Sequence, residues 1–187
     1  MIVAATNLDA AAARLESEHG LRAAGGGRHE GLGTHNRIVS LVGGYLEILA
    51  VADADEAARS RLGRALAARI ARAAEGLMGW AVAVDDVASV AERLGTPVNT
   101  IVRQGLSARL TGVLEAMATP FLPFFIARDP GIEDPGGSGG AGGIEWIEVA
   151  GDPDQLDAWL GGARLPVRVV EGAPAVRAVA IGGRILR

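Results

Sequence analysis

Few side chains in this sequence could carry acid–base or metal chemistry. The chain has three histidines, His19, His29 and His35, and no cysteine. The absence of cysteine excludes disulfides, zinc–thiolate sites and cysteine nucleophiles. From residue 36 onward the chain has no histidine. Imidazole chemistry must therefore come from the first strands and loops.

Two other catalytic motifs are present only in part. The glycines of residues 25–33 suggest a phosphate-binding loop, but we expect a strand to follow them where such a loop requires a helix. Ser40, Ser107 and Ser138 lack the Gly-x-Ser-x-Gly elbow of serine hydrolases. The sequence therefore predicts neither a phosphate loop nor a hydrolase triad.

A repeated local pattern supplies the elements that would position these side chains. Three segments begin as a short apolar strand, pass through an Asn or Asp cap, continue as a helix and end at glycine. Asn and Asp favour helix N-caps, and glycine favours the left-handed closing residue. Apolar residues recur at helical spacing within each predicted helix. The three segments lie within residues 2–20, 80–95 and 144–161.

Further strands follow each repeat. Residues 35–42 and 45–51 flank Gly43 and Gly44, a pair that favours a tight hairpin turn. Other strands are expected over 98–102, 108–114, 121–127, 167–170 and 176–181. The predicted organisation is a first βαβββ-type unit over 1–52, a connecting helix over 53–77, a second βαβββ-type unit over 78–129, a Gly/Pro-rich linker over 130–143 and a partial third unit over 144–187.

The hairpin determines which side chains share a face with Glu47. If Ser40 pairs with Glu47 across the turn, strand alternation places Asn36, Ser40, Tyr45 and Glu47 on one face. The same alternation turns His35 to the opposite face. Glu47 and His35 are therefore not expected to act together.

Several short motifs spread over the chain resemble one family. They are Asn7-Leu8-Asp9-Ala10-Ala11, Gly27-Arg28-His29, Gly31-Leu32-Gly33-Thr34-His35-Asn36, Tyr45-Leu46-Glu47, Leu122-Pro123-Phe124-Phe125 and Gly142-Gly143-Ile144. With the repeated units, they resemble the glyoxalase-like branch of the vicinal oxygen chelate superfamily, which includes glyoxalases, extradiol dioxygenases and bleomycin-resistance proteins. The resemblance implies an α+β fold, in which tandem βαβββ units form a cupped mixed sheet with helices on the outside, plus a third partial unit.

Metal-dependent members of the superfamily use a histidine on the first strand of each unit and a glutamate on the last strand. Glu47 matches the first glutamate. The other three positions fall just before Met1, near Gly79 and near Pro123, where this chain offers no side-chain ligand. We therefore expect no metal site and no cofactor.

The resulting hypothesis is a protein that binds a small molecule in an apolar cup, with its reaction unassigned. Glu47 is the catalytic candidate, and the ligand-binding candidates are Asn36, Ser40, Tyr45, Phe121, Phe125 and His29. The alternatives without a functional role are a solvated Glu47, an exposed His29 and phenylalanines that only fill the cup. Two competing functions stay open: a metal-dependent lyase, isomerase or dioxygenase that regains a histidine, and a non-enzymatic dimeric interaction module.

The composition of the chain limits the kinds of partner that it can bind. The chain has 187 residues, 49% of them hydrophobic, and a net charge of −4. An acidic chain has no general attraction to nucleic acid or anionic membranes. No apolar stretch approaches the ~20 residues of a membrane span, and no leader pattern follows Met1. We expect a cytoplasmic protein whose partners are a small molecule and a second copy in a homodimer.

Overall fold

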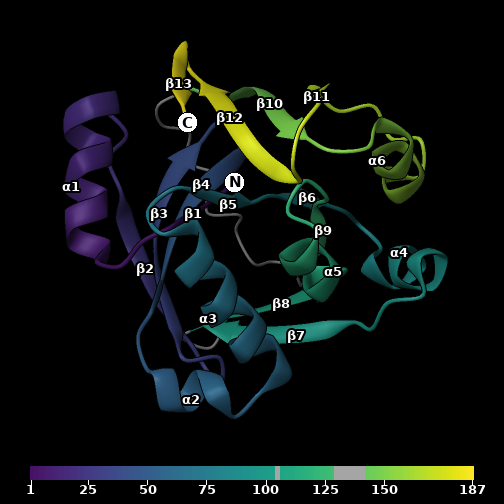
Figure 1. Ribbon diagram of the computed structural model, residues 1–187. Coiled ribbons are helices and arrows are strands. Elements are labelled where there is room, and N and C mark those ends of the chain that lie inside the picture. The colour runs from purple at the N-terminus through teal and green to yellow at the C-terminus, as the bar shows by residue number, and fades with distance from the viewer. Residues whose placement is uncertain (104–105, 129–141) are drawn as a thin grey trace.

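The computed structural model describes residues 1–103, 106–128 and 142–187, which form two β-sheets and six helices (Figure 1). The helices are α1 Leu8–His19, α2 Ala54–Ala58, α3 Arg61–Ala73, α4 Val87–Leu94, α5 Val113–Ala118 and α6 Pro153–Leu160. The strands are β1 Ile2–Ala4, β2 Ala24–His29, β3 Thr34–Leu41, β4 Gly44–Val51, β5 Leu77–Gly79, β6 Ala81–Ala83, β7 Asn99–Arg103, β8 Leu106–Thr111, β9 Phe124–Arg128, β10 Ile144–Ala150, β11 Val167–Val170, β12 Ala175–Ile181 and β13 Arg184–Leu186.

The three predicted strand–helix repeats are confirmed. The side chains of Asn7, Asp86 and Asp152 each accept hydrogen bonds from backbone N–H groups in the first turn of α1, α4 and α6. A glycine in the left-handed conformation closes each of these helices. These local signals place α4 and α6 at the residues where the sequence predicts them.

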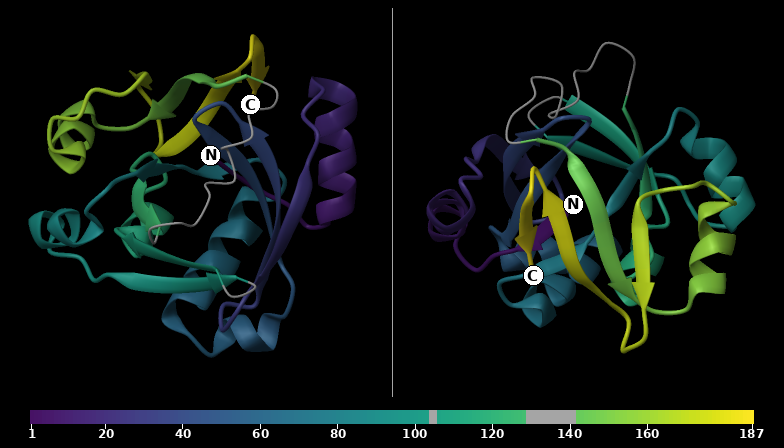
Figure 2. Two further views of the ribbon diagram at one scale, coloured as in Figure 1. Left: turned by 180° about the vertical axis from the view of Figure 1, so that it is seen from behind. Right: turned by 90° about the horizontal axis from the view of Figure 1, so that it is seen from above.

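The larger sheet has the order β5-β1-β4-β3-β2-β7-β8-β9-β6 and mixes parallel with antiparallel pairs. The predicted α+β class, with tandem units on a curved mixed sheet, is confirmed. The halves meet where His29 of β2 pairs with Arg103 of β7. Both halves curve around a common interior (Figure 2).

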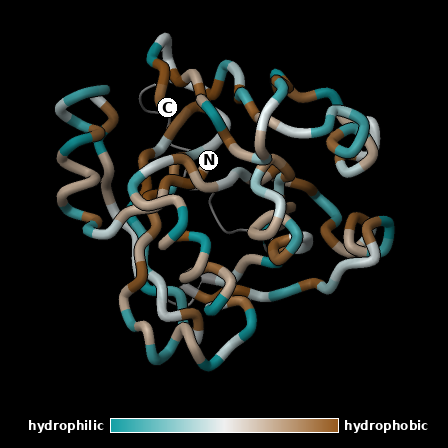
Figure 3. The backbone as a smooth tube through the Cα atoms, viewed as in Figure 1, coloured by the Kyte–Doolittle hydropathy of each residue, from teal (hydrophilic) through white to brown (hydrophobic). Residues whose placement is uncertain are grey.

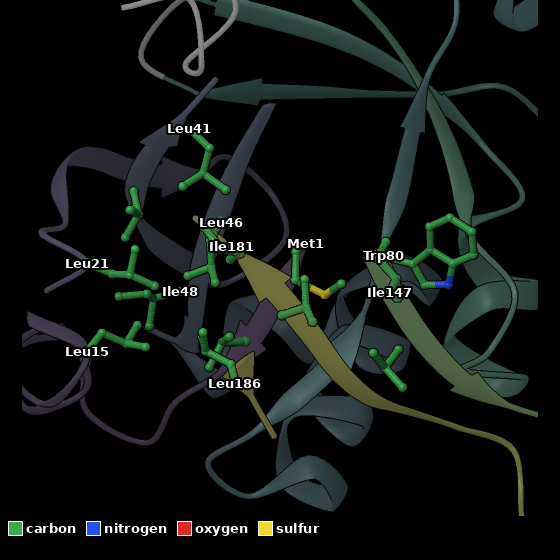
Figure 4. Close-up of a cluster of buried hydrophobic side chains, with 14 of the residues drawn as sticks. Met1, Leu15, Leu21, Leu41, Leu46, Ile48, Trp80, Ile147, Ile181 and Leu186 are labelled. Carbon is green, nitrogen blue, oxygen red and sulfur yellow. The ribbon is translucent and has the colours of Figure 1, made fainter. Parts of the chain in front are cut away.

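The convex face of β1, β3 and β4 is buried under α1 and under the second sheet, β11-β10-β12-β13. Leu15 of α1 packs in one cluster with Leu41 and Ile48, and Ile181 of the second sheet joins the same cluster (Figure 4). Full burial of one such aliphatic side chain contributes about 1.5–3 kcal/mol. The third unit is therefore part of the main core.

Two helices lie on the concave face, in addition to those outside the sheet. The predicted connecting helix is divided into α2 and α3, and Leu66 and Ile70 of α3 pack against Leu49. Helix α5 replaces the end of the strand predicted over 108–114, because Gly112 turns the chain with φ of 72°. Figure 3 shows both hydrophobic and hydrophilic residues along α1, whose buried residues are Leu8, Ala11 and Leu15.

The register of the β3–β4 hairpin differs from the predicted register by two residues. Ser40 pairs with Tyr45, Ile38 pairs with Glu47, and the turn lies at Val42 and Gly43. A two-residue shift preserves alternation, so the predicted shared face is retained. Strand β2 takes the place of a glycine-rich loop before the hairpin. Of the predicted linker over 130–143, residues 130–141 lie outside the described residues.

No helix within the described ranges has the length and apolar character required to span a bilayer.

Candidate functional site

A cavity of about 100 Å³ lies on the concave face of the larger sheet. That is room for several waters or for part of a small organic molecule. Its apolar lining includes Ile2, Leu49, Leu66, Leu110, Phe124 and Ile126. Its polar lining consists of His29, Asn36, Tyr45, Glu47, Ser107 and Arg128. A mainly apolar surface with a few convergent polar groups is typical of a small-molecule site.

Asn36 lies at the centre of a chain of polar contacts along one wall. Its Oδ1 accepts a hydrogen bond from the backbone N–H of Gly27 at 3.0 Å. Its Nδ2 donates to Oε1 of Glu47 at 2.5 Å and lies 3.2 Å from Nε2 of His29. Nδ1 of His29 lies 3.0 Å from Oγ1 of Thr34. Thus β2, β3 and β4 hold four polar side chains in one connected arrangement.

Glu47 is nearly enclosed, with 13% of its side chain exposed, and Oε1 lies 3.7 Å from Nε2 of His29. Ile2 is its partner on β1. A carboxylate among apolar neighbours loses solvation, so the hydrogen bond from Asn36 matters more than it would in water. The site thus contains a carboxylate that Asn36 holds in place at the wall of the cavity.

A second polar group lies at the end of β9. Nη2 of Arg128 donates to the Tyr45 hydroxyl at 3.0 Å, and its guanidinium carbon lies 5.4 Å from the centre of the Tyr45 ring. Tyr45 therefore links β4 to β9, because its ring and hydroxyl contact the same arginine. The cavity has hydrogen-bond donors in this group and a carboxylate in the other.

The structure brings together four of the seven candidate residues: His29, Asn36, Tyr45 and Glu47 line one cavity. Ser40 lies on the same strand face and pairs with Tyr45 across the hairpin, but it is not one of the residues that line the cavity.

The expected orientation of the two phenylalanines is wrong. Phe121 is buried in the convex core, and the ring of Phe125 lies 6.5 Å from that of Trp159. Phe124 and Ile126 line the cavity in their place. The reason is that β9 begins at Phe124, paired with Ala81, so alternation starts one residue out of phase with the prediction.

Sequence reasoning missed Arg128 and the apolar residues supplied by α3 and α5. Leu66 lies on a helical face that its spacing predicts, but the direction of that face is set by tertiary packing. Arg128 lies one residue beyond the strand predicted over 121–127. No motif in the sequence singles it out.

An ion-pair cluster anchors the turn that carries His29. Arg28 contacts both Glu56 and Asp53, and Glu56 also accepts a hydrogen bond from Gly31 N–H at 2.8 Å. The hydrogen bond from Arg28, followed by that from Gly31, lowers the pKa of Glu56 below its usual range. Helix α2 thereby fastens the β2–β3 turn.

Replacing Arg28 with glutamine is expected to flatten the acid side of the stability profile. A depressed folded-state pKa adds stability that is present above the ordinary glutamate pKa and is lost as the pH falls through the folded-state value. The variant should lose less stability than the parent on acidification through this window, as measured by urea unfolding. Arg22→Gln, whose nearest carboxylate oxygen is 3.8 Å away, is the control. Parallel profiles for parent and Arg28→Gln would refute the role of the cluster.

Among the described residues, the side chains around Glu47 do not form a donor set for a divalent metal. In the part of the chain that the structure describes, no three His, Asp or Glu side chains lie together where they could hold an ion. Strand pairing places Ile2 beside Glu47 in the first half, and it places Ala81 beside Phe124 in the second half. Neither pair supplies an imidazole. A single carboxylate clamped by an amide N–H is a poor donor set for such an ion.

Comparison with solved structures identifies the same architecture. A hypothetical protein from Staphylococcus aureus matches with a TM-score of 0.62 at 14% identity, covering 88% of each chain. A variant of Streptomyces coelicolor methylmalonyl-CoA epimerase, in complex with 2-nitronate-propionyl-CoA, matches with a TM-score of 0.52 at 20% identity, covering 72% of this chain and 94% of that one. No curated protein matches.

The family profile described as "Glyoxalase-like domain" matches residues 1–165. This span includes both units of the larger sheet and all the residues that line the cavity. The chain therefore belongs to the glyoxalase-like domain family.

Proposed function

We propose that this protein binds a small, largely apolar molecule in its concave cavity without the help of a metal ion. The observation that carries the proposal is the carboxylate of Glu47, enclosed by apolar side chains and fixed by Asn36. Burying a charged group costs solvation free energy. A charged group at a cavity wall is therefore typical of ligand recognition or proton transfer. Phe124, Leu110 and Ile126 supply the apolar surface.

Glu47 is the group we assign to chemistry. A carboxylate at the wall of a cavity can accept a proton from a molecule bound beside it, and Asn36 holds the orientation of this one. The reaction is accordingly of the acid–base kind, with Glu47 taking a proton from the bound molecule. The epimerase complexes, which hold methylmalonyl-CoA and 2-nitronate-propionyl-CoA, support the use of this fold for binding small-molecule ligands.

We also infer a cytoplasmic protein that works as a homodimer and has no nucleic-acid or membrane partner. The net charge of −4 supports the last point. Edge strands β5 and β6 of the larger sheet offer pairing surfaces for a second copy. Light scattering on a sizing column tests the dimer.

Filling the cavity should weaken ligand binding. Leu110 is 4% exposed and lines the apolar end, so Leu110→Trp places an indole in the space a ligand would use. With 2-octanol as the probe, the parent should show thermal stabilisation that grows with alcohol concentration, because the ligand binds only the folded state. We expect the dissociation constant of Leu110→Trp to rise at least about 10-fold.

The control is Val98→Trp, because Val98 is 43% exposed and lies outside the cavity lining. It should bind 2-octanol as the parent does. Equal binding by the parent and Leu110→Trp would place the ligand elsewhere and overturn the proposal.

A further inference from the structure

The orientation of the Asn36 amide is fixed by its backbone partner. A backbone N–H can only donate, so the atom of Asn36 that faces Gly27 N at 3.0 Å must be the carbonyl oxygen. The NH₂ group then points toward Glu47 and His29, at 2.5 Å and 3.2 Å. Asn36 is 5% exposed, so little solvent can exchange these roles.

This orientation determines the tautomer of His29. The Asn36 NH₂ group donates, so Nε2 of His29 must accept and carries no proton. A neutral imidazole then bears its proton on Nδ1, which donates to Oγ1 of Thr34 at 3.0 Å. Thr34 is fully buried, which favours this single arrangement.

The tautomer in turn sets the chemistry of the wall. The two hydrogens of the Asn36 amide are directed at His29 and Glu47, and His29 presents no N–H toward Glu47, although Nε2 lies 3.7 Å from Oε1. The exposed part of the Glu47 carboxylate can only accept hydrogen bonds. A ligand carbonyl placed here would meet an acceptor, whereas a hydroxyl or amine would find a partner.

We propose that Asn36 locks His29 as the Nδ1–H tautomer and thereby makes this wall select a hydrogen-bond donor, so that the ligand presents a hydroxyl or amine group to Glu47. This inference rests on the proposed function, because it specifies the ligand class of the same cavity. A hydrogen bond to a charged acceptor, compared with an unpaired carbonyl, favours the alcohol of a matched pair by about 10- to 100-fold.

The first experiment needs no ligand. Nitrogen-15 NMR of the imidazole rings should place Nδ1 of His29 in the range of a protonated ring nitrogen and Nε2 in that of an unprotonated one. In Asn36→Leu the ring should revert to a mixture of tautomers, whereas Asn99→Leu, outside the cavity lining, should leave it unchanged. A proton on Nε2 in the parent protein would overturn the proposal even if Asn36→Leu fails to fold.

The second experiment compares 2-octanol with 2-octanone by titration against the parent protein. The alcohol should bind about 10- to 100-fold more tightly. Equal or tighter binding of the ketone would overturn the donor preference while leaving small-molecule binding intact. If neither probe binds, the proposed function fails together with the ligand class, and the NMR result alone reports on the tautomer.

Discussion

Gly33→Ala is expected to destabilise the protein by about 3–5 kcal/mol, the sum of backbone strain and overpacking. Gly33 has φ of +64°, and a Cβ there would lie 2.2 Å from the carbonyl oxygen of Asp53 and 2.4 Å from the backbone nitrogen of Ala57. The Gly33 carbonyl also accepts hydrogen bonds from Ala52 and Asp53 N–H. Movement of either segment would detach α2 from the turn beside His29.

Gly31→Ala isolates the strain from the crowding. Gly31 has φ of +73°, but a Cβ there would have no atom within 4 Å. We expect a loss of about 1 kcal/mol from strain alone. Urea unfolding of both variants checks the difference. Equal losses would show that the contact with α2 does not constrain the turn.

Glu47→Gln is expected to weaken 2-octanol binding by about 10- to 100-fold, because it removes a charged acceptor while preserving the size of the side chain. Asn36 Nδ2 would still find a carbonyl oxygen, so the new NH₂ group takes the place of Oε2 and donates into the cavity. The ketone should therefore bind better to the variant than to the parent, and the preference for alcohol should reverse.

Titration calorimetry of both probes against parent and variant measures this reversal. Glu92→Gln on the exposed side of α4 is the matched control and should change neither affinity. If Glu47→Gln binds both probes as the parent does, the carboxylate takes no part in recognition. In that case the rest of the cavity lining would recognise the ligand.

The helices were predictable because their signals are local. Asp152 with Pro153 at the start of α6, and Gly161 at its end, act through their own backbone neighbours. Strand β2 was not predictable, since Ala24-Gly25-Gly26-Gly27 has no side-chain alternation to read. Its strand character comes from pairing with β3.

The candidate site was predictable where alternation within one hairpin decides the face. Asn36, Tyr45 and Glu47 follow from one turn, and even a two-residue error in register leaves them together. The prediction for Phe121 and Phe125 failed because the start of β9 is fixed by pairing with β6, which is far away in the sequence. The direction of Leu66 likewise depends on how α3 crosses the sheet, which no spacing encodes.

The covering of the back of the hairpin by β10, β12 and β13 makes the first two units dependent on the third. On the side of the hairpin opposite the cavity, Ile147, Val179 and Leu186 of the second sheet pack in one cluster with Leu46 and Ile48 of β4. A chain that ended after β9 would expose this apolar surface to water and would be prone to aggregate. The third unit covers that side, so substitutions in the ligand-facing wall leave this support in place.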